Sequence, residues 1–380
     1  MSQPLLPYAY ERRVALACTI AAGQLCETVR HDQASIAFHK PDHSPVTVAD
    51  YGAQALICRA LRHYFPQDPV LGEEDAQMLA SPAMGDCLTQ VVRYVQGALS
   101  PEAPGETAHP GQGESRDPLP RWMPPWLWEE IADLGPSDRP HLPLDPQQVL
   151  QWIAHGKQGQ PQGRFWTLDP IDGTKGYVRG DQYAVALALI ENGQVQVAVM
   201  VAPALPRSRD PQTQGDRGVA FVAVRGQGAE AIALPSGQRS PLGVNPAAPF
   251  SQFRLIESVE RDHGTPPWQR AVAQTLGLNP TPLQMDSLAK YGAIARGEAD
   301  LYLRLPTGNS ALRYENIWDH AAGVLVLEEA GGQVTDQTGQ PLDFSQGSKL
   351  LHNRGIVASN GTLHAATLAA IRQHQDQFLL

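Results

Sequence analysis

The stretch FWTLDPIDGTKGYVRGDQYAVALALIENGQV, residues 165–195, joins a short apolar run to two aspartates and then to a second apolar run. The two acids, Asp169 and Asp172, are separated by a Pro-Ile pair and followed at once by glycine. Asp-Pro and Asp-Gly are both typical of turns. The segment therefore predicts a bend at the end of a strand. A turn alone is the simplest explanation of the two aspartates. A metal site is the better explanation if further acidic residues lie close to them.

The residues after this bend predict an antiparallel sheet. Residues 183–190 (YAVALALI) and 194–202 (QVQVAVMVA) are apolar, and Asn192-Gly193 lies between them. An Asn-Gly pair between two such runs is a strong signal for a two-residue hairpin. Shorter runs of the same kind follow, so strands are expected over residues 165–235.

After a proline-containing link at 240–250, the expected order of strands and helices changes. Strand-like runs at 253–258, 299–305 and 355–359 alternate with helical patterns, which indicates an α/β arrangement. The helices expected in this part are residues 266–276, 287–297, 319–330 and 362–376. In the first part, helices are expected at residues 8–30, 47–64 and 145–156. We therefore predict two domains, residues 1–240 and 241–380.

Residues 80–145 interrupt the first part. The run SPEAPGETAHPGQGESRDPLP is rich in proline, glycine and acid, which predicts a mobile surface loop or insertion. The segment RWMPPWLWEE, residues 121–130, carries three tryptophans. Packing of this segment against the body of the protein is favoured over a binding platform.

Composition and charge limit the classes of function. The chain has 380 residues, 42% hydrophobic and 18% charged, with a formal net charge of -10. This balance argues against a protein that coats nucleic acid or binds anionic membranes, because both roles need a basic face. It permits a small anionic substrate if metal ions or local cations reverse the field. We expect a monomer with a small-molecule substrate.

Cysteine usage and hydropathy point to the cytoplasm. The four cysteines show no CxxC pair and no zinc-like spacing, so reduced thiols are expected. No run approaches the ~18 apolar residues of a membrane span. The alanine-rich run near the N-terminus is interrupted by polar residues and predicts an amphipathic helix in place of a signal peptide.

Further acids stand at the ends of other elements. Asp50 ends the run SPVTVAD, Glu73 and Glu74 follow FPQDPVLG, and Asp319 begins an apolar helix in NIWDHAAG. Each has an ordinary explanation alone: a surface helix residue, a solvated loop acid or a helix N-cap. Four separate explanations for acids at four turn-like positions are less satisfactory than one shared role.

Together these pieces resemble the lithium-sensitive, magnesium-dependent phosphatase superfamily that contains inositol monophosphatases and fructose-1,6-bisphosphatases. LDPIDGTKGYVRG is similar to the branch that hydrolyses 3'-phosphoadenosine 5'-phosphate, the 3'(2'),5'-bisphosphate nucleotidases, and it lacks the Thr-Asn-Phe continuation usual in inositol monophosphatases. The resemblance covers most of the chain, through ESVERDHG, MDSLAKYG, ADLYLRLP and IWDHAAGVLVLEEAGG, and fails mainly across residues 80–145. It implies a layered αβαβα sandwich of mixed α+β and α/β class.

The resemblance also implies a site with two or three Mg²⁺ ions. Magnesium prefers oxygen ligands, and in such sites it acidifies a bound water and steadies the leaving oxygen. The ligands implied are Glu73, Asp169, the Ile171 carbonyl, Asp172 and Asp319. Asp50 and Thr174 match the pair that positions and deprotonates the attacking water. Glu74 is left outside the ligand set.

The substrate contacts implied by the same resemblance are Gly173, Thr174, His263, Ser287, Lys290 and Arg304. The backbone amides of Gly173 and Thr174 would bind phosphate oxygens at the start of a helix. Lys290 and Arg304 make physical sense as partners of a second phosphate in an acidic chain.

The reaction expected is removal of the 3'-phosphate from adenosine 3',5'-bisphosphate, with its sulfated precursor also accepted. The alternatives are an inositol polyphosphate 1-phosphatase or inositol monophosphatase, and a non-catalytic nucleotide sensor. A redox dinucleotide enzyme is disfavoured because no strand-linked GxGxxG is present. A Walker A motif is absent as well.

Overall fold

The computed structural model describes residues 6–32, 37–40, 45–100, 124–131, 143–157, 162–207, 216–259, 266–306 and 314–378. The helices are α1 (Ala9–His31), α2 (Val48–Tyr64), α3 (Ala76–Leu79), α4 (Gly85–Leu99), α5 (Pro125–Ile131), α6 (Pro146–Ala154), α7 (Thr174–Arg179), α8 (Pro266–Leu276), α9 (Ala289–Ala295), α10 (Ala321–Glu329) and α11 (His364–Phe378), with short 3-10 turns at Pro82–Met84 and Phe250–Gln252. The strands are β1 (Phe38–His39), β2 (Pro45–Val46), β3 (Val70–Gly72), β4 (Arg164–Asp172), β5 (Ala184–Glu191), β6 (Gln194–Pro206), β7 (Arg217–Val224), β8 (Ala229–Ala233), β9 (Arg239–Pro241), β10 (Arg254–Glu257), β11 (Asn279–Gln284), β12 (Leu301–Arg304), β13 (Gln333–Thr335) and β14 (Ile356–Ser359).

Two large sheets organise the molecule. The first has seven strands in the order β3-β4-β5-β6-β7-β8-β9, and the second has five in the order β11-β10-β12-β14-β13. The seven-stranded sheet is antiparallel except for the parallel pair of β3 and β4. In the five-stranded sheet, β10 runs parallel to β11 and β12, and β14 runs antiparallel to β12 and β13.

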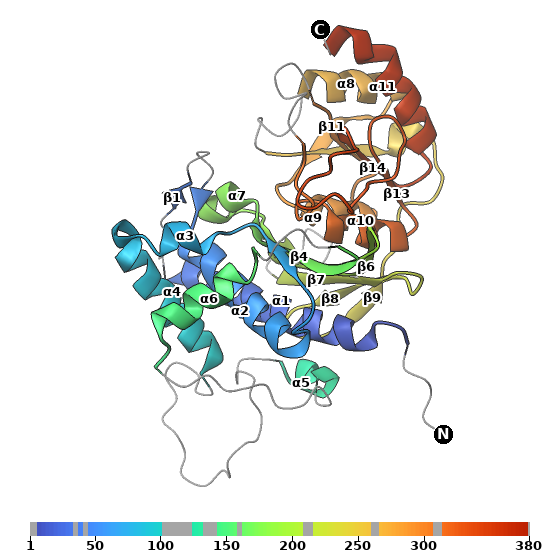
Figure 1. The fold of residues 1–380 in the computed structure, drawn as a ribbon. Helices are drawn as coiled ribbons and strands as arrows, with labels where there is room; N and C mark the ends of the chain where they lie inside the picture. Colours follow the sequence, from blue (N-terminus) through green and yellow to red (C-terminus); the bar gives the residue numbers. More distant parts are fainter. Residues whose placement is uncertain are drawn as a thin grey trace, which may run out of the picture.

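Helices cover both faces of each sheet, as Figure 1 shows. One core packs α1, α2, α4 and α6 on one face of the seven-stranded sheet. A second core lies between the two sheets and contains α9 and α10. A third packs α8 and α11 on the far face of the five-stranded sheet. The expected layered αβαβα sandwich is confirmed.

The strand β5 illustrates how the sequence specifies these layers. Val185, Leu187 and Leu189 face the first core, whereas the intervening Ala184, Ala186 and Ala188 face the second. Alternate residues of a strand point to opposite faces of its sheet. The small alanines on the inner face leave room for α10, which contacts β5, β6 and β7.

The hairpin predicted at Asn192-Gly193 is present. Asn192 has φ 51° and Gly193 has φ 77°, the left-handed values that a type I′ turn requires at both central positions. The division into domains 1–240 and 241–380 stays a prediction. The seven-stranded sheet ends at Pro241 and the other begins at Arg254, but the core between the sheets draws residues from both parts.

The expectation of a loop throughout residues 80–145 is wrong at its beginning. Residues 85–99 form α4, which buries Cys87, Val91, Tyr94 and Val95 and packs against α2. These positions recur at the spacing of a helix face, a signal that the neighbouring Pro- and Gly-rich composition obscured. Residues 101–123 and 132–142 lie outside the described residues.

Candidate active site

The parallel pairing of β3 with β4 brings the first acids together. Gly72 pairs with Leu168, and the Glu73 amide donates to the Leu168 carbonyl at 3.2 Å. Both strands run in the same direction, so Glu73 and Asp169 emerge at the same edge of the sheet. Two segments almost a hundred residues apart in sequence thus deliver neighbouring carboxylates.

The Asp-Pro-Ile-Asp segment belongs to β4, so the predicted turn is corrected to a strand with an irregularity. Asp169 pairs with Ala186 and Asp172 with Ala184, so Pro170 and Ile171 on β4 oppose the single residue Val185 on β5. An extra residue of this kind is a β-bulge, which redirects side chains and is frequent beside active sites. The chain turns only at Gly173, with φ 86°, immediately before α7.

Asp50 is fixed by the start of α2. Its Oδ2 accepts hydrogen bonds from the Thr47 amide at 2.7 Å and the Thr47 hydroxyl at 2.6 Å, which forms a capping box. The Thr174 hydroxyl lies 3.5 Å from Asp50 Oδ1 and 3.1 Å from the Ile171 carbonyl oxygen. Asp50 is buried, so it is not a surface helix residue.

Asp319 comes from the segment between β12 and α10, in the part of the chain that forms the five-stranded sheet. It precedes α10 by two residues, and one of its oxygens lies 3.8 Å from Arg304 Nη2. The same Arg304 nitrogen pairs with Glu315 at 2.7 Å. Carboxylate and imidazole atoms of Glu315, Asp319 and His320 lie within 4.8 Å of one another. Glu315 was missed from the sequence because RYEN, residues 313–316, matches no motif.

The electrostatics of Asp169 show an acidic cluster that needs cations. Burial raises the pKa of Asp169 well above its ordinary value, and the carboxylates of Glu73, Asp172, Asp319 and Asp50 raise it further. Asp169 Oδ1 is buried without a hydrogen-bond partner. A buried charge is costly unless it is paired or coordinates a metal. An orphaned carboxylate oxygen among four other acids therefore fits a site for hard, oxygen-loving cations.

Three other acids of the cluster share this behaviour. Burial raises the pKa of Asp50, Asp172 and Asp319 to about 6 each. Partial compensation comes from the Thr47 hydrogen bond at Asp50, from Lys290 and the Leu288 amide at Asp172, and from Arg304 at Asp319. The Leu288 amide donates to Asp172 Oδ2.

These pKa values predict that divalent metal binding is linked to proton release. Cations bind the deprotonated carboxylates, and below about pH 6 protons compete for the same oxygens. The apparent affinity for Mg²⁺ should therefore fall as the pH falls from 7.5 to 5.5. Calorimetric titration in two buffers with different ionisation enthalpies measures the protons released, which should be more numerous at pH 6 than at pH 8. Equal affinity at pH 5.5 and 7.5 would contradict the linkage.

Lys40 is a neighbour of the cluster that sequence reasoning missed. Its Nζ pairs with Glu73 at 2.8 Å and with Glu74 at 2.7 Å, and these two acids raise its pKa. Glu74 is buried, in contrast to a solvated loop acid, and the Gln54 side chain bonds both its amide and its carbonyl. The run HKPDH offers no motif that would have identified Lys40.

The predicted substrate contacts lie beside the acids. Lys290 is 5% exposed, and burial lowers its pKa to about 8 against the opposing effect of Asp172. Its Nζ lies 5.1 Å from the centre of the Tyr302 ring. Ser287 is buried with φ 67°, and its Cβ is the nearest atom to a Cβ built at Gly173, at 3.1 Å. His263 lies outside the described residues.

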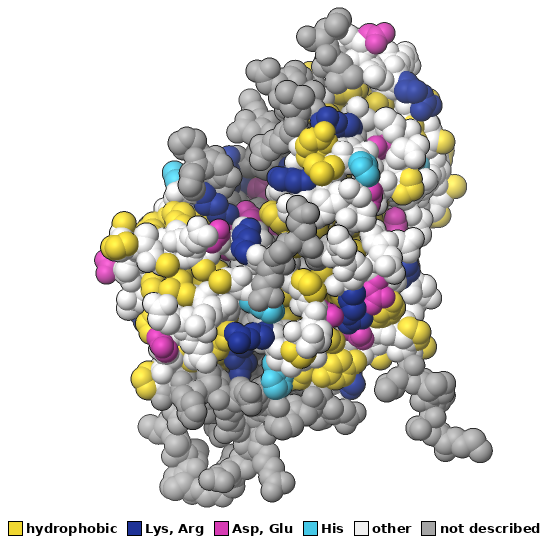
Figure 2. Space-filling model, in the orientation of Figure 1, with side chains coloured by type: hydrophobic (Ala, Val, Ile, Leu, Met, Phe, Trp, Pro, Cys, Tyr) yellow, Lys and Arg dark blue, Asp and Glu magenta, His cyan; other side chains and the backbone are white. Residues whose placement is uncertain are grey.

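Acidic and basic side chains accordingly occur together in the hollow between the two parts of the molecule, as Figure 2 shows. The structure thus brings together Asp50, Glu73, Asp169, Asp172, Thr174 and Asp319, and sets Gly173, Ser287, Lys290 and Arg304 next to them. Their chemical roles stay predictions.

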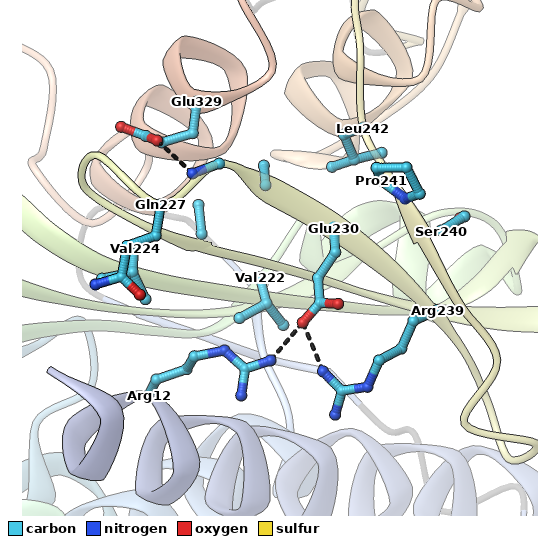
Figure 3. A pocket seen from close by; sticks show the side chains of 13 residues that line it. Arg12, Val222, Val224, Gln227, Glu230, Arg239, Ser240, Pro241, Leu242 and Glu329 are labelled. Atoms are coloured by element: carbon cyan, nitrogen blue, oxygen red, sulfur yellow. Dashed lines mark hydrogen bonds and ion pairs between the residues drawn. The ribbon is translucent and has the colours of Figure 1, made fainter. Parts of the chain in front are cut away.

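A separate cavity of about 470 Å³ lies over β7, β8 and β9. Arg12 and Arg239 converge there on the Glu230 carboxylate (Figure 3). Both arginines also pair with Glu130 of α5. The charges on this wall are thus mutually satisfied, which makes the cavity a weak candidate for a charged ligand.

The helix α5 explains the tryptophan-rich segment. Trp126 donates a hydrogen bond to the Pro235 carbonyl at 2.8 Å and lies beside Arg239. Leu127 is fully buried in the first core. This part of the segment therefore packs against the body of the protein, as expected.

Two general features agree with the sequence. All four cysteines are free and buried. Among the described residues, no helix has the length and apolar character needed to cross a membrane.

Comparison with known proteins identifies relatives of this site and fold. The sequence family described as the inositol monophosphatase family matches residues 147–376. The chain is 36% identical to a 3'(2'),5'-bisphosphate nucleotidase of Emericella nidulans, over 97% of this chain and 99% of that protein. It is also 36% identical to a 3'(2'),5'-bisphosphate nucleotidase of Schizosaccharomyces pombe, over 92% and 91% of the two chains. An inositol monophosphatase structure from Anabaena has the same fold, with a TM-score of 0.53 and 20% identity over 96% of this chain and 95% of that one.

Proposed function

Because the chain belongs to the inositol monophosphatase family, we propose that it is a metal-dependent phosphatase that removes the 3'-phosphate from adenosine 3',5'-bisphosphate. The observation that carries the proposal is the buried cluster around Asp169, with its unpaired carboxylate oxygen, beside the buried cation Lys290. Relatives named 3'(2'),5'-bisphosphate nucleotidase that align over nearly the whole chain support the choice of substrate. The sulfated precursor is a second expected substrate.

In this proposal the cluster holds two or three Mg²⁺ ions. Glu73, Asp169, the Ile171 carbonyl, Asp172 and Asp319 supply the oxygens. When bound, magnesium supplies Lewis-acid chemistry: it neutralises charge on the phosphate and makes water a stronger acid. The bulge in β4 holds the ligands of that strand in place before the substrate arrives, and the capping box at the start of α2 does the same for Asp50.

Thr174 and Asp50 handle the proton of the attacking water. The Thr174 hydroxyl accepts a hydrogen bond from the water and donates its own proton toward Asp50 Oδ1, 3.5 Å away in this structure. Asp50 acts as the base of the pair. Its other oxygen is held by Thr47, so the free oxygen faces Thr174.

Specificity in this proposal comes from the cations beside the acids. The amides of Gly173 and Thr174 bind the phosphate that is cleaved. Ser287, Lys290, Arg304 and His263 bind the nucleotide and its 5'-phosphate. Hydrogen bonds between a cation and a phosphate are stronger than those between neutral groups. A substrate with a second phosphate requires additional cations of this kind. Arg304 now pairs with Glu315 and would be shared with the substrate.

The experiment that tests the proposal is phosphate release from three substrates. Adenosine 3',5'-bisphosphate, adenosine 3'-monophosphate and inositol 1,4-bisphosphate are compared with Mg²⁺, with EDTA and with millimolar Li⁺. We expect preference for the bisphosphate nucleotide, loss of activity in EDTA and inhibition by Li⁺. Preference for the inositol compound would replace the substrate assignment with the inositol phosphatase alternative. No release from any of them would favour a nucleotide sensor.

Replacement of Lys290 tests the basis of specificity. Lys290→Met keeps the length and apolar body of the side chain and removes its charge. A charge-assisted hydrogen bond contributes about 1.5–3 kcal/mol, so kcat/KM for the bisphosphate should fall roughly 10- to 150-fold. The value for adenosine 3'-monophosphate should fall much less. Arg93→Met, which removes an exposed cation on α4, should change neither, and an equal loss with both nucleotides would contradict the assignment.

A further inference from the structure

The loop between β11 and α9, residues 285–288, carries Ser287 and leads directly to Lys290. The Met285 amide continues the pairing of the sheet by donating to the Glu257 carbonyl at 2.9 Å. Beyond Met285, side-chain contacts from the first part of the chain hold the loop. The position of the predicted nucleotide contacts therefore depends on a junction between two segments more than a hundred residues apart.

An ion pair is central to that junction. Arg179 Nη2, at the end of α7, lies 2.5 Å from Asp286 Oδ2. Asp286 is 4% exposed, and its other oxygen accepts a hydrogen bond from the Val259 amide at 3.2 Å. Arg179 also pairs with Asp181 at 3.1 Å, but that carboxylate is 58% exposed. Breaking the pair is more costly at Asp286 than at Asp181, because a buried carboxylate would be left without its cation.

Two glycines allow the close approach. A Cβ atom at Gly176 would lie 2.4 Å from the Gln182 carbonyl oxygen and 3.1 Å from Asp286 Oδ2. A Cβ at Gly173 would lie 3.1 Å from Ser287 Cβ. The first turns of α7 are therefore packed directly on the 285–288 loop. The Leu288 amide adds a third link through its hydrogen bond to Asp172.

The two sides of the junction differ in how firmly they are held. Tyr177 of α7 is fully buried, donates a hydrogen bond to the Cys26 carbonyl at 2.8 Å and packs edge to face on Tyr183. These contacts stay when Arg179 is removed. Among the described residues, the loop would keep its hydrogen bonds at Met285, Val259 and Leu288 and the core packing of Met285 and Leu288, but would lose the ion pair that holds Asp286. Loss of the pair should therefore displace the loop and leave α7 in place.

We propose that Arg179 and Asp286 are a positioning pair that sets Ser287 and Lys290 relative to the acidic cluster and so determines preference for a substrate with two phosphates. The proposal rests on the proposed function for its substrate. Arg179 acts through Asp286 and the loop, and makes no contact with the substrate itself. The cleaved phosphate, bound at the acidic cluster, is largely independent of the pair.

The test compares Arg179→Met with the wild-type chain on two nucleotides. KM for adenosine 3',5'-bisphosphate should rise about tenfold, while kcat for it and kcat/KM for adenosine 3'-monophosphate should stay within about twofold. Arg179→Lys keeps the charge and should recover most of the loss. Asp181→Asn removes the exposed partner of the same arginine and should behave as wild type. An unchanged KM, or an equal loss with both nucleotides, would overturn the proposal.

A second measurement separates this proposal from the substrate assignment. Hydrogen exchange of the peptide that contains residues 285–290 should be faster in Arg179→Met than in wild type, with residues 174–178 unaffected. This outcome does not depend on which substrate the protein uses. Unchanged exchange in the loop would overturn the positioning role even if the nucleotide is the substrate. Faster loop exchange in Arg179→Met, together with a wild-type protein that does not hydrolyse the bisphosphate, would refute only the substrate assignment.

Discussion

Asp169→Asn is expected to reduce metal-dependent turnover at least 10³-fold and, in EDTA, to raise the melting temperature. The carboxylate is buried among four other acids with one oxygen unpaired. An amide removes the cost of burying that charge, so the metal-free protein gains stability. The same change removes the proposed ligand nearest to the other acids of the cluster. Electrostatic stabilisation by metal ions would lower the barrier by several kcal/mol.

Thermal unfolding with and without Mg²⁺ measures both effects. Wild-type protein should be stabilised by Mg²⁺, because ligands that bind only the native state raise its stability. The variant should melt higher than wild type in EDTA and show little response to Mg²⁺. Asp86→Asn, at an exposed position on α4, should retain both activity and the response. Near-normal turnover, or a full Mg²⁺ response in Asp169→Asn, would refute the site.

Thr174→Val should lower kcat by about 10²- to 10⁴-fold, the range that general acid–base catalysis contributes. Valine has nearly the shape of threonine and lacks the hydroxyl that connects the Ile171 carbonyl with Asp50. KM for the bisphosphate should change by less than about threefold, since the cations proposed to bind it are untouched. Thr174→Ser restores the hydroxyl and should restore most of the rate.

Thr19→Val is the matched control for this change. Thr19 is fully buried in α1, and its hydroxyl donates to the Ala15 carbonyl at 2.7 Å. The substitution also removes a hydroxyl bonded to a backbone carbonyl, but it does so on α1, which carries none of the acids of the cluster. Thermal unfolding compares its stability directly with that of Thr174→Val, and its kcat should equal that of wild type. A Thr174→Val protein with normal kcat and a raised KM would show a binding role instead.

Local sequence signals determined most of the secondary structure. The Asn192-Gly193 pair fixed a hairpin because few other residues adopt left-handed backbone at two successive positions. The helix expected at 145–156 is present as α6, and the Asp145 side chain caps it by accepting a hydrogen bond from the Gln147 amide. The helix at 85–99 was not predicted because the Pro- and Gly-rich run that follows it favours a loop over residues 80–145. Its buried positions are nevertheless spaced as a helix face.

The candidate site was predicted differently from the fold. Asp50, Glu73, Asp169, Asp172 and Asp319 stand out only as a set, and their resemblance to a known family joined them. Periodicity and propensity describe neighbours along the chain and cannot bring together residues 50 and 319. The parallel pair of β3 and β4, the bulge in β4 and the packing of the two sheets do so.

By itself, then, the sequence predicted most strands and helices from local pattern, and it predicted the layered fold and the acids of the proposed site through resemblance to a known family. Only the tertiary structure decided which carboxylate each cation near the site pairs with. Lys40 neutralises Glu73 and Glu74, Arg304 is held by Glu315, and Arg179 meets the buried Asp286. The physical reason is that a charge takes its partner from whatever packing brings within a few ångströms, and that distance has no counterpart in sequence separation.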